Sequence, residues 1–255
     1  MARKIVLLVK VFDKEEYADA FIATGEMFCK TIGQFKRIEG DAARGDQFEA
    51  PWGWHQPDGI SLRISYKTSG GEEKSFPIDD LAGPLVMQRA ALDHLNAFCM
   101  YAVTIPDFEE TYETEEERMR VVEKVNSMLK GHAKINEEML SLGEHAVVIF
   151  EVENFIDKVS KAAKSEGYSI WGKLVDYFDP DSFDGSFGEI ESLFKKRNIY
   201  SYQKEFRFVF DSGKPGVATT LHAGHLGKIS FKVKTSEINS KFELKLAEDQ
   251  PANGY

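Results

Sequence analysis

The sequence predicts an α+β protein with one domain, built on a mixed, mostly antiparallel sheet with flanking helices. Short apolar or alternating segments, typical of strands, are mixed with amphipathic segments of helical period. They do not follow the regular strand–helix–strand rhythm that a doubly wound parallel sheet requires. The composition shows no linker-like break, so we expect one domain over 1–247 and a loose C-terminal tail over 248–255.

The first half of the chain contains four expected elements and one long loop. The apolar run 4–12 predicts a first strand rather than a signal peptide, because a lysine interrupts it and no cleavage signal follows. A helix is expected over 14–25, where a glycine ends the apolar stripe. The Gly-, Pro- and Asp-rich segment 39–59 predicts an irregular loop. Residues 60–66 alternate as a strand before a Gly-Gly hairpin turn, and 95–103 predicts a central strand.

The second half alternates helices and strands. The clearest helix is 114–132, which begins with a Thr-Glu capping box. Residues 145–150 predict a strand, and 152–166 predict a helix with one apolar face. Residues 169–178 predict a further strand, and 187–198 predict a helix with a basic end.

Composition limits the possible functions. The 255 residues include 19 Phe and 9 Tyr, which predict a large aromatic core. A formal net charge of −10 argues against broad electrostatic binding to nucleic acid or to an anionic membrane. No apolar run is long enough to span a membrane. Cys29 and Cys99 lie among apolar neighbours, so we expect reduced thiols that are not bonded to each other, in a cytoplasmic protein.

The segment "YSYQKEFRFVF", 200–210, carries the main candidate site. Its alternation predicts a strand with a mostly aromatic inner face. Gln203, Glu205 and Arg207 would share the other face, because side chains two residues apart on a strand point the same way. A carboxylate beside an amide can polarise a hydroxyl group or stabilise developing positive charge. The alternative is a solvated sheet face that carries an ordinary Glu205–Arg207 pair.

The loop 39–59 carries a second candidate. Trp54 and its neighbour Trp52 could stack on a planar ring, with His55 as a hydrogen-bond donor. We expect one of the two indoles to close over the cleft that Glu205 lines. The alternative is a loop held in place by tryptophan burial. The "RGD" of the same loop is interpreted as a turn with a local Arg44–Asp46 pair.

Two further clusters are weaker candidates. The basic run 195–197 could attract phosphates, although such a run is more often the solvated end of a helix. His222 and His225 have a spacing compatible with metal binding, but no third ligand accompanies them, so no metal site is expected. Phosphate-binding glycine loops and a GxSxG nucleophile elbow are absent from the sequence.

The order of motifs resembles a family of uncharacterised bacterial and prophage proteins. The resemblance covers roughly residues 5–235 and rests on segments such as "TGEMFCKTIGQFKRIEGDAARGDQFEA", "VDYFDPDSFDG" and "FKKRNIYSYQKEFRFVF". The last of these contains a Y-x-x-E-x-R strand pattern. The resemblance carries no secure activity with it.

A weaker resemblance is to the ADP-ribosyltransferases, which have an α+β split-sheet fold. Gln203 and Glu205 match their Q-x-E pair, Lys10 stands where a first-strand Arg or His would be, and Thr31 falls near a Ser/Thr position. The resemblance implies that Glu205 would bind a hydroxyl of the nicotinamide ribose while Gln203 orients the acceptor. The candidate cofactor-binding residues are Lys10, Thr31, Trp54, His55 and Arg207.

The leading hypothesis is therefore an ADP-ribosyltransferase-like enzyme or NAD glycohydrolase that uses NAD as substrate, without a metal. Its target would be a macromolecule, as in a toxin or phage-defence effector. The alternative is a non-catalytic bacterial or phage module that binds a protein through its acidic surface and tryptophan loop. A third hypothesis, a nuclease, finds no support, because the sequence shows no cluster of carboxylates that would bind its metal ions.

Overall fold

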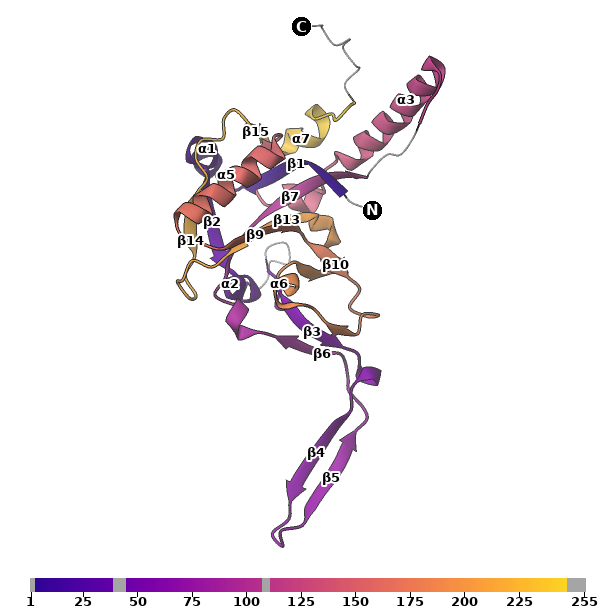
Figure 1. Cartoon of the computed structure of the whole chain (residues 1–255), viewed down its shortest axis with the longest axis vertical. Coiled ribbons are helices and arrows are strands. Elements are labelled where there is room, and N and C mark those ends of the chain that lie inside the picture. Colours follow the sequence, from indigo (N-terminus) through magenta and orange to yellow (C-terminus); the bar gives the residue numbers. More distant parts are fainter. Residues whose placement is uncertain (1–2, 39–44, 107–110, 247–255) are drawn as a thin grey trace.

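The computed structural model describes residues 3–38, 45–106 and 111–246, and it confirms the α+β class. An antiparallel main sheet carries helices on both faces, and three small sheets extend from it (Figure 1). Within the main sheet the neighbours run in the order β14-β2-β7-β1-β8-β15, and β13 joins β7 to β9. Its strands are β1 (Arg3–Phe12), β2 (Glu26–Thr31), β7 (Asn96–Pro106), β8 (His145–Ile149), β9 (Ile170–Leu174), β13 (Glu205–Phe210), β14 (Thr219–His222) and β15 (Ser230–Lys234).

The small sheets and the helices complete the described elements. The small sheets are the parallel pair β10 (Asp176–Phe178) and β12 (Lys195–Arg197), the trio β11 (Gly185–Ser186), β3 (Pro51–His55) and β6 (Leu85–Gln88), and the hairpin β4 (Leu62–Lys67) with β5 (Glu73–Ile78). The α-helices are α1 (Glu15–Thr24), α2 (Ile32–Lys36), α3 (Glu115–His132), α4 (Glu137–Leu140), α5 (Val152–Ser165), α6 (Glu189–Ser192) and α7 (Thr235–Lys241). Short 3-10 turns are η1 (Pro57–Gly59), η2 (Ala90–Leu92) and η3 (Asn198–Gln203).

Local sequence signals explain several helix ends. Helix α1 stops at Gly25, whose φ of +66° is left-handed and whose missing Cβ would lie 2.6 Å from the carbonyl oxygen of Gly224. Helix α3 begins at the predicted capping box, in which Thr114 and Glu117 each accept a hydrogen bond from the other's backbone nitrogen. The described part of the chain contains no helix long and apolar enough to cross a membrane.

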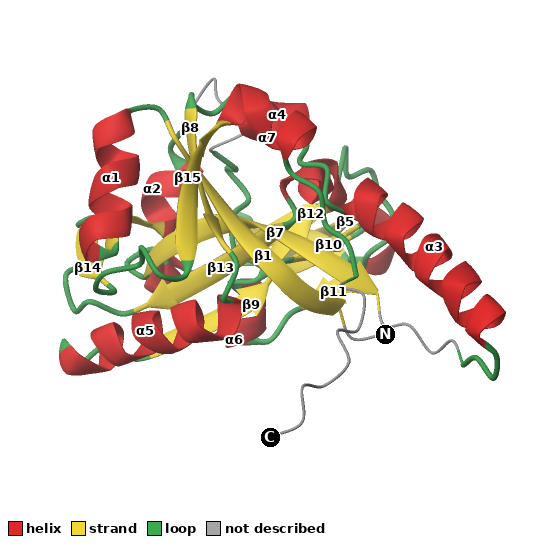
Figure 2. Ribbon diagram, turned by 90° about the horizontal axis from the view of Figure 1, so that it is seen from above, coloured by secondary structure: helices red, strands yellow, loops and turns green. Residues whose placement is uncertain are grey.

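The two faces of the main sheet carry different cores. Figure 2 shows α5 on one side of the sheet and α4 with α7 on the other. The α5 side is the large aromatic core that the composition predicts, where Phe155 contacts both Phe21 and Phe208 with ring centroids 5.9 Å apart. The other side holds two smaller cores, one around Tyr101 and one around Val209. The candidate site lies between these two smaller cores.

Three sequence-based expectations are wrong at the site. The helix expected over 187–198 is only the four-residue α6, after which the chain becomes strand β12 and pairs with β10. The strand expected over 200–210 begins only at Glu205, because 198–203 form η3 and Lys204 turns the chain with a left-handed φ of +37°. The loop expected over 39–59 contains strand β3, and its residues 39–44 lie outside the described residues. The tail 248–255 also lies outside them.

Candidate functional site

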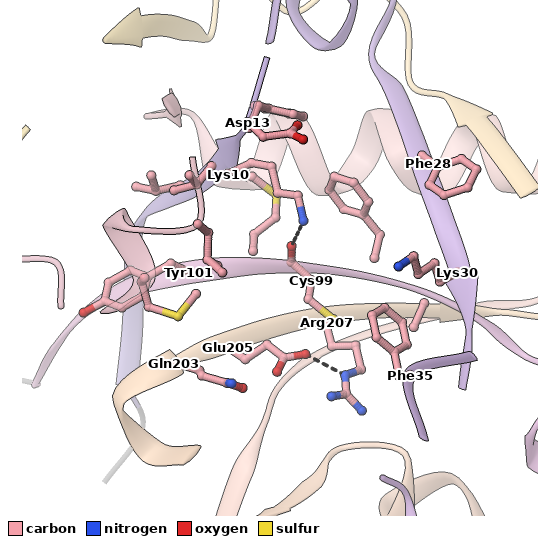
Figure 3. Close-up of a pocket in the computed structure, with 18 of the residues that line it drawn as sticks. Lys10, Asp13, Phe28, Lys30, Phe35, Cys99, Tyr101, Gln203, Glu205 and Arg207 are labelled. Atoms are coloured by element: carbon pink, nitrogen blue, oxygen red, sulfur yellow. Dashed lines mark hydrogen bonds and ion pairs between the residues drawn. The ribbon is translucent and has the colours of Figure 1, made fainter. Parts of the chain in front are cut away.

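Glu205 and Arg207 do not lie on a solvated sheet face. Glu205 is 5% exposed and Arg207 is 1% exposed, although both occupy the polar face that the alternation predicts. Arg207 donates a hydrogen bond from Nε to Glu205 Oε1 over 2.8 Å (Figure 3). Its Nη1 donates to Glu49 Oε1 and to the carbonyl oxygen of Leu193, both over 2.7 Å. The predicted pair is therefore real, but it is buried.

Lys196 completes this buried ionic cluster. Its Nζ lies 3.1 Å from Glu205 Oε2 and 3.5 Å from Glu49 Oε2, and it donates to Gln203 Oε1 over 2.8 Å. Two cations and two carboxylates thus alternate in a low-dielectric region, which is the arrangement that makes buried charge tolerable. We call Glu49, Lys196, Glu205 and Arg207 the ionic cluster.

The ionic cluster fixes the charge state of Glu205. Burial alone would raise the pKa of this carboxyl, but the charges of Arg207 and Lys196 outweigh burial and hold its pKa well below the usual range. For Lys196 the effects have the opposite sign. Burial would lower its pKa, but the negative charges of Glu205 and Glu49 outweigh burial and raise it. Glu205 is therefore an ionised acceptor throughout the physiological pH range, and a weak base.

Gln203 lies beside Glu205, as expected, but it does not belong to the same strand. It ends η3 rather than belonging to the strand, and the left-handed turn at Lys204 sets the direction in which the chain enters β13. Lys196 joins the two side chains, since it donates to both of them. The two residues of the predicted Q-x-E pair are thus brought together by a lysine that was not predicted to take part.

Both residues line a cavity of about 640 Å³. Its floor is the middle of β7, and its walls come from β1, β2, α2, α4 and the ionic cluster. Lysine and aromatic side chains share these walls, and Figure 3 shows several of them around the same space. The lining includes Lys10, Tyr17, Phe28, Lys30, Phe35, Cys99, Tyr101, Met139, Lys196, Gln203, Glu205 and Arg207.

The cavity exists because the main sheet splits. Strand β1 pairs with β7 only as far as Val9 and Tyr101, and β2 pairs with β7 only at Ala97 and Asn96. Between these points, residues 98–100 have a ladder partner on one edge only, which is β13. Lys10 spans this gap, where its Nζ donates to the carbonyl oxygen of Cys99 over 2.8 Å (Figure 3). The predicted first-strand cation therefore lies in the cavity wall.

Three predicted cofactor-binding residues lie elsewhere. Thr31 is fully buried and caps helix α2, where its hydroxyl accepts from the backbone nitrogen of Gln34. Trp54 donates from its indole nitrogen to the carbonyl oxygen of Pro180, and His55 contacts Asp184 at 3.1 Å. Among the described residues, the cavity lining includes none of these three.

The expectation that an indole closes over the Glu205 cleft is therefore wrong. Trp54 is buried between Phe48 and Phe178 in the small β11-β3-β6 sheet, with centroids 5.4 and 5.5 Å from theirs. Trp52 packs under the guanidinium of Arg89. Burial of the tryptophans, the alternative explanation, accounts for Trp54.

Sequence reasoning did not place Glu49 at the site, and it did not predict that Lys196 contacts Glu205. Asp46 pairs with Arg197 over 2.8 Å. Its expected partner Arg44 lies outside the described residues. Of the two explanations for the run 195–197, the solvated helix end is wrong for Lys196, because its place in β12 turns its side chain into the protein. A strand reading of the short run 195–197 would have alternated Lys196 inward and its two neighbours outward.

A metal site finds no support in the described ranges. No group of three or more His, Cys, Asp or Glu side chains there could hold a metal ion. His222 lies 3.8 Å from Glu26, while His225 contacts the carbonyl oxygen of Ala23. Cys29 and Cys99 are free thiols, as predicted.

Comparisons of the chain with protein-family models, curated proteins and solved structures found no match. The function must therefore be argued from the cavity itself.

Proposed function

We propose that the cavity binds NAD and that the protein is an ADP-ribosyltransferase or NAD glycohydrolase in which Glu205 is the catalytic carboxylate. The observation that carries the proposal is the meeting of Glu205 and Gln203 on one wall of a half-open cavity of about 640 Å³. This volume lies within the range of small-molecule sites, which are concave and largely preformed. An open sheet face would have offered no such site.

The bonding of Glu205 determines what it can do. Each of its oxygens accepts one hydrogen bond from a cation, which leaves further lone pairs for a ligand hydroxyl. Its lowered pKa makes it a poor general base, so its proposed role is electrostatic. It would accept a hydrogen bond from the nicotinamide ribose and stabilise the positive charge that develops as the glycosidic bond breaks. The bonding electrons leave with nicotinamide, and water or an acceptor nucleophile attacks the sugar carbon.

The remaining walls suit the rest of such a ligand. Lys10 and Lys30 supply positive charge for a pyrophosphate, and Phe28, Phe35 and Tyr101 supply faces for planar rings. The split between β1 and β2 agrees with the split sheet that the resemblance to ADP-ribosyltransferases implies. Gln203 lines the cavity near Glu205, and its proposed role is to orient the acceptor.

The test is NAD turnover by the purified protein. We expect nicotinamide release, or ADP-ribose labelling of a component of a cell lysate, and a rise in Tm with NAD. Glu205→Gln should lower the rate on the order of 10²-fold or more, as for other groups that stabilise transition-state charge. Gln203→Ala should reduce transfer more than hydrolysis. Glu116→Gln, which changes a carboxylate in an exposed pair with Arg120 on α3, is the control and should keep full activity.

Stability must be measured beside activity, because Glu205→Gln also removes a buried charge. Glu205→Asp keeps the charge with a shorter side chain and should recover part of the stability but little of the rate. Absence of nicotinamide release, of labelling and of any thermal shift with NAD would refute the proposal. The remaining candidate would then be the non-catalytic interaction module, which the shape of the β4–β5 hairpin favours.

A further inference from the structure

The β4–β5 hairpin extends away from the rest of the protein (Figure 1). Every residue of β5 is exposed, and in β4 only Leu62 is partly buried. A two-stranded hairpin is marginally stable by itself in water. We therefore ask which partner the side chains of this hairpin could bind.

One face of this hairpin is apolar. The register pairs Leu62 with Ile78, Ile64 with Phe76, and Tyr66 with Lys74, and the paired side chains lie on one face. Ile64 is 58% exposed and Phe76 is 50% exposed, and the rings of Tyr66 and Phe76 stack. We call this set the hairpin face.

The opposite face is polar. It pairs Ser65 with Ser75, whose hydroxyls are 2.9 Å apart, and Lys67 with Glu73. Such a division is typical of a sheet that packs against a partner on one side only. A continuous row of exposed apolar side chains on a projecting element marks an interaction surface.

The charges on the hairpin indicate which kind of partner the hairpin face could bind. Residues 62–80 carry three basic and four acidic side chains, a net charge of −1, which does not favour nucleic acid or an anionic membrane. Lys74, near the tip, carries the one charge on the hairpin face, while Asp79 and Asp80 follow its last apolar residue at the base. The two ends of the hairpin face thus have opposite charge.

We propose that the hairpin face binds the hairpin face of a second copy of the chain, in an antiparallel dimer with two-fold symmetry. With the axis at the Ile64–Phe76 pair, position 74 of one copy lies opposite position 78 of the other, because Phe76 is midway between them. Each Lys74 then lies beside Asp79 and Asp80 of the second copy. A two-fold interface must be self-complementary, and this face is complementary to itself in both shape and charge.

The first test is the mass of the protein in solution, by sedimentation equilibrium over a concentration series. We expect a concentration-dependent dimer. Phe76→Asp should weaken it tenfold or more, since the charge falls at the centre of the interface. Ser75→Asp, one residue away on the polar face, is the matched control and should leave the dimer intact. An unchanged Tm of the main transition shows that each variant is folded.

Charge reversal tests the arrangement independently. Lys74→Glu should weaken the dimer about tenfold, and adding Asp79→Lys and Asp80→Lys should restore it. A monomer up to about 100 μM would overturn the proposal, as would a dimer that survives Phe76→Asp. Failure of the triple variant to restore dimerisation would overturn the antiparallel register. Binding of the monomer to neutral phosphatidylcholine vesicles would assign the hairpin face to lipid instead.

Discussion

Lys10 donates a hydrogen bond from its side-chain nitrogen to the main-chain carbonyl oxygen of Cys99 over 2.8 Å. This contact replaces a ladder bond that neither β1 nor β2 makes, since both strands have left β7 at that point. An unpaired buried carbonyl costs free energy comparable to a lost hydrogen bond. A lysine in the cavity wall thus allows the main sheet to open while the backbone stays satisfied.

Lys10→Met should therefore destabilise the protein. The variant keeps a long apolar stem but loses a charged donor to a half-buried carbonyl, so we expect a loss of about 1.5–3 kcal/mol in the free energy of unfolding. Lys4→Met, also on β1 but exposed, should cost less than about 0.5 kcal/mol. Urea denaturation of both variants measures the difference. Equal stability of the two variants would show that the contact with Cys99 contributes nothing.

Arg207→Met should be far more costly. The substitution leaves Glu205 and Glu49 with Lys196 as the remaining cation of the ionic cluster, and breaking a buried pair from one side costs about 3–5 kcal/mol. Arg120→Met breaks an exposed pair with Glu116 on α3 and should cost at most about 0.5 kcal/mol. Chemical denaturation should separate the two variants clearly. A loss below about 1 kcal/mol for Arg207→Met would mean that the buried charges rearrange at little cost.

Acid should remove the contribution of Glu205. Its pKa in the folded protein is lowered, from about 4.3 in an unfolded chain, so its stabilising effect is fully present above that value. The effect is lost as the pH falls further, toward the pKa of the folded state. We therefore expect the difference in Tm between wild type and Glu205→Gln to be constant from pH 7 to about 5 and to shrink below about pH 4. A difference that does not depend on pH would contradict the ionised state of this side chain.

The fold class could be predicted because strands and helices of the main sheet have clear periods. The face of β13 that holds Phe206 and Phe208 faces the aromatic core, and Glu205 and Arg207 share the other, as the alternation indicates. What the alternation cannot supply is the environment of that second face. Whether a polar face meets water or a buried lysine depends on segments far away in the sequence.

The errors have the same physical origin. The segment 187–198 has a helical pattern, but pairing of Lys196 with Tyr177 across β12 and β10 overrides local propensity. Glu49 contacts Arg207 across 158 positions of sequence, so no short-range spacing could reveal it. Lys10 could be placed at the site only through the resemblance to ADP-ribosyltransferases. Gln203 could be placed there through its spacing from Glu205.

Native thiol chemistry should be slow at both cysteines. Burial, reinforced by the charge of Glu205, raises the pKa of Cys99 to about 12, and burial also raises the pKa of Cys29 well above its usual value. Since the thiolate is the reactive form, Cys99 should react with Ellman's reagent at pH 8 on the order of 10³-fold more slowly than a free cysteine. Cys29, which is more deeply buried, should react more slowly still.

Cys99 is half-buried and lines the cavity, whereas Cys29 is fully buried, so the single variants Cys29→Ser and Cys99→Ser distinguish the two rates. In 8 M urea, or at any denaturant concentration that unfolds the chain, both thiols should react at the rate of a free cysteine. In Glu205→Gln, where the neighbouring negative charge is gone, Cys99 should react faster and Cys29 should not change. A rapidly reacting Cys99 in the native wild type would contradict the raised pKa, and equal acceleration of both thiols in the variant would indicate general loosening of the fold.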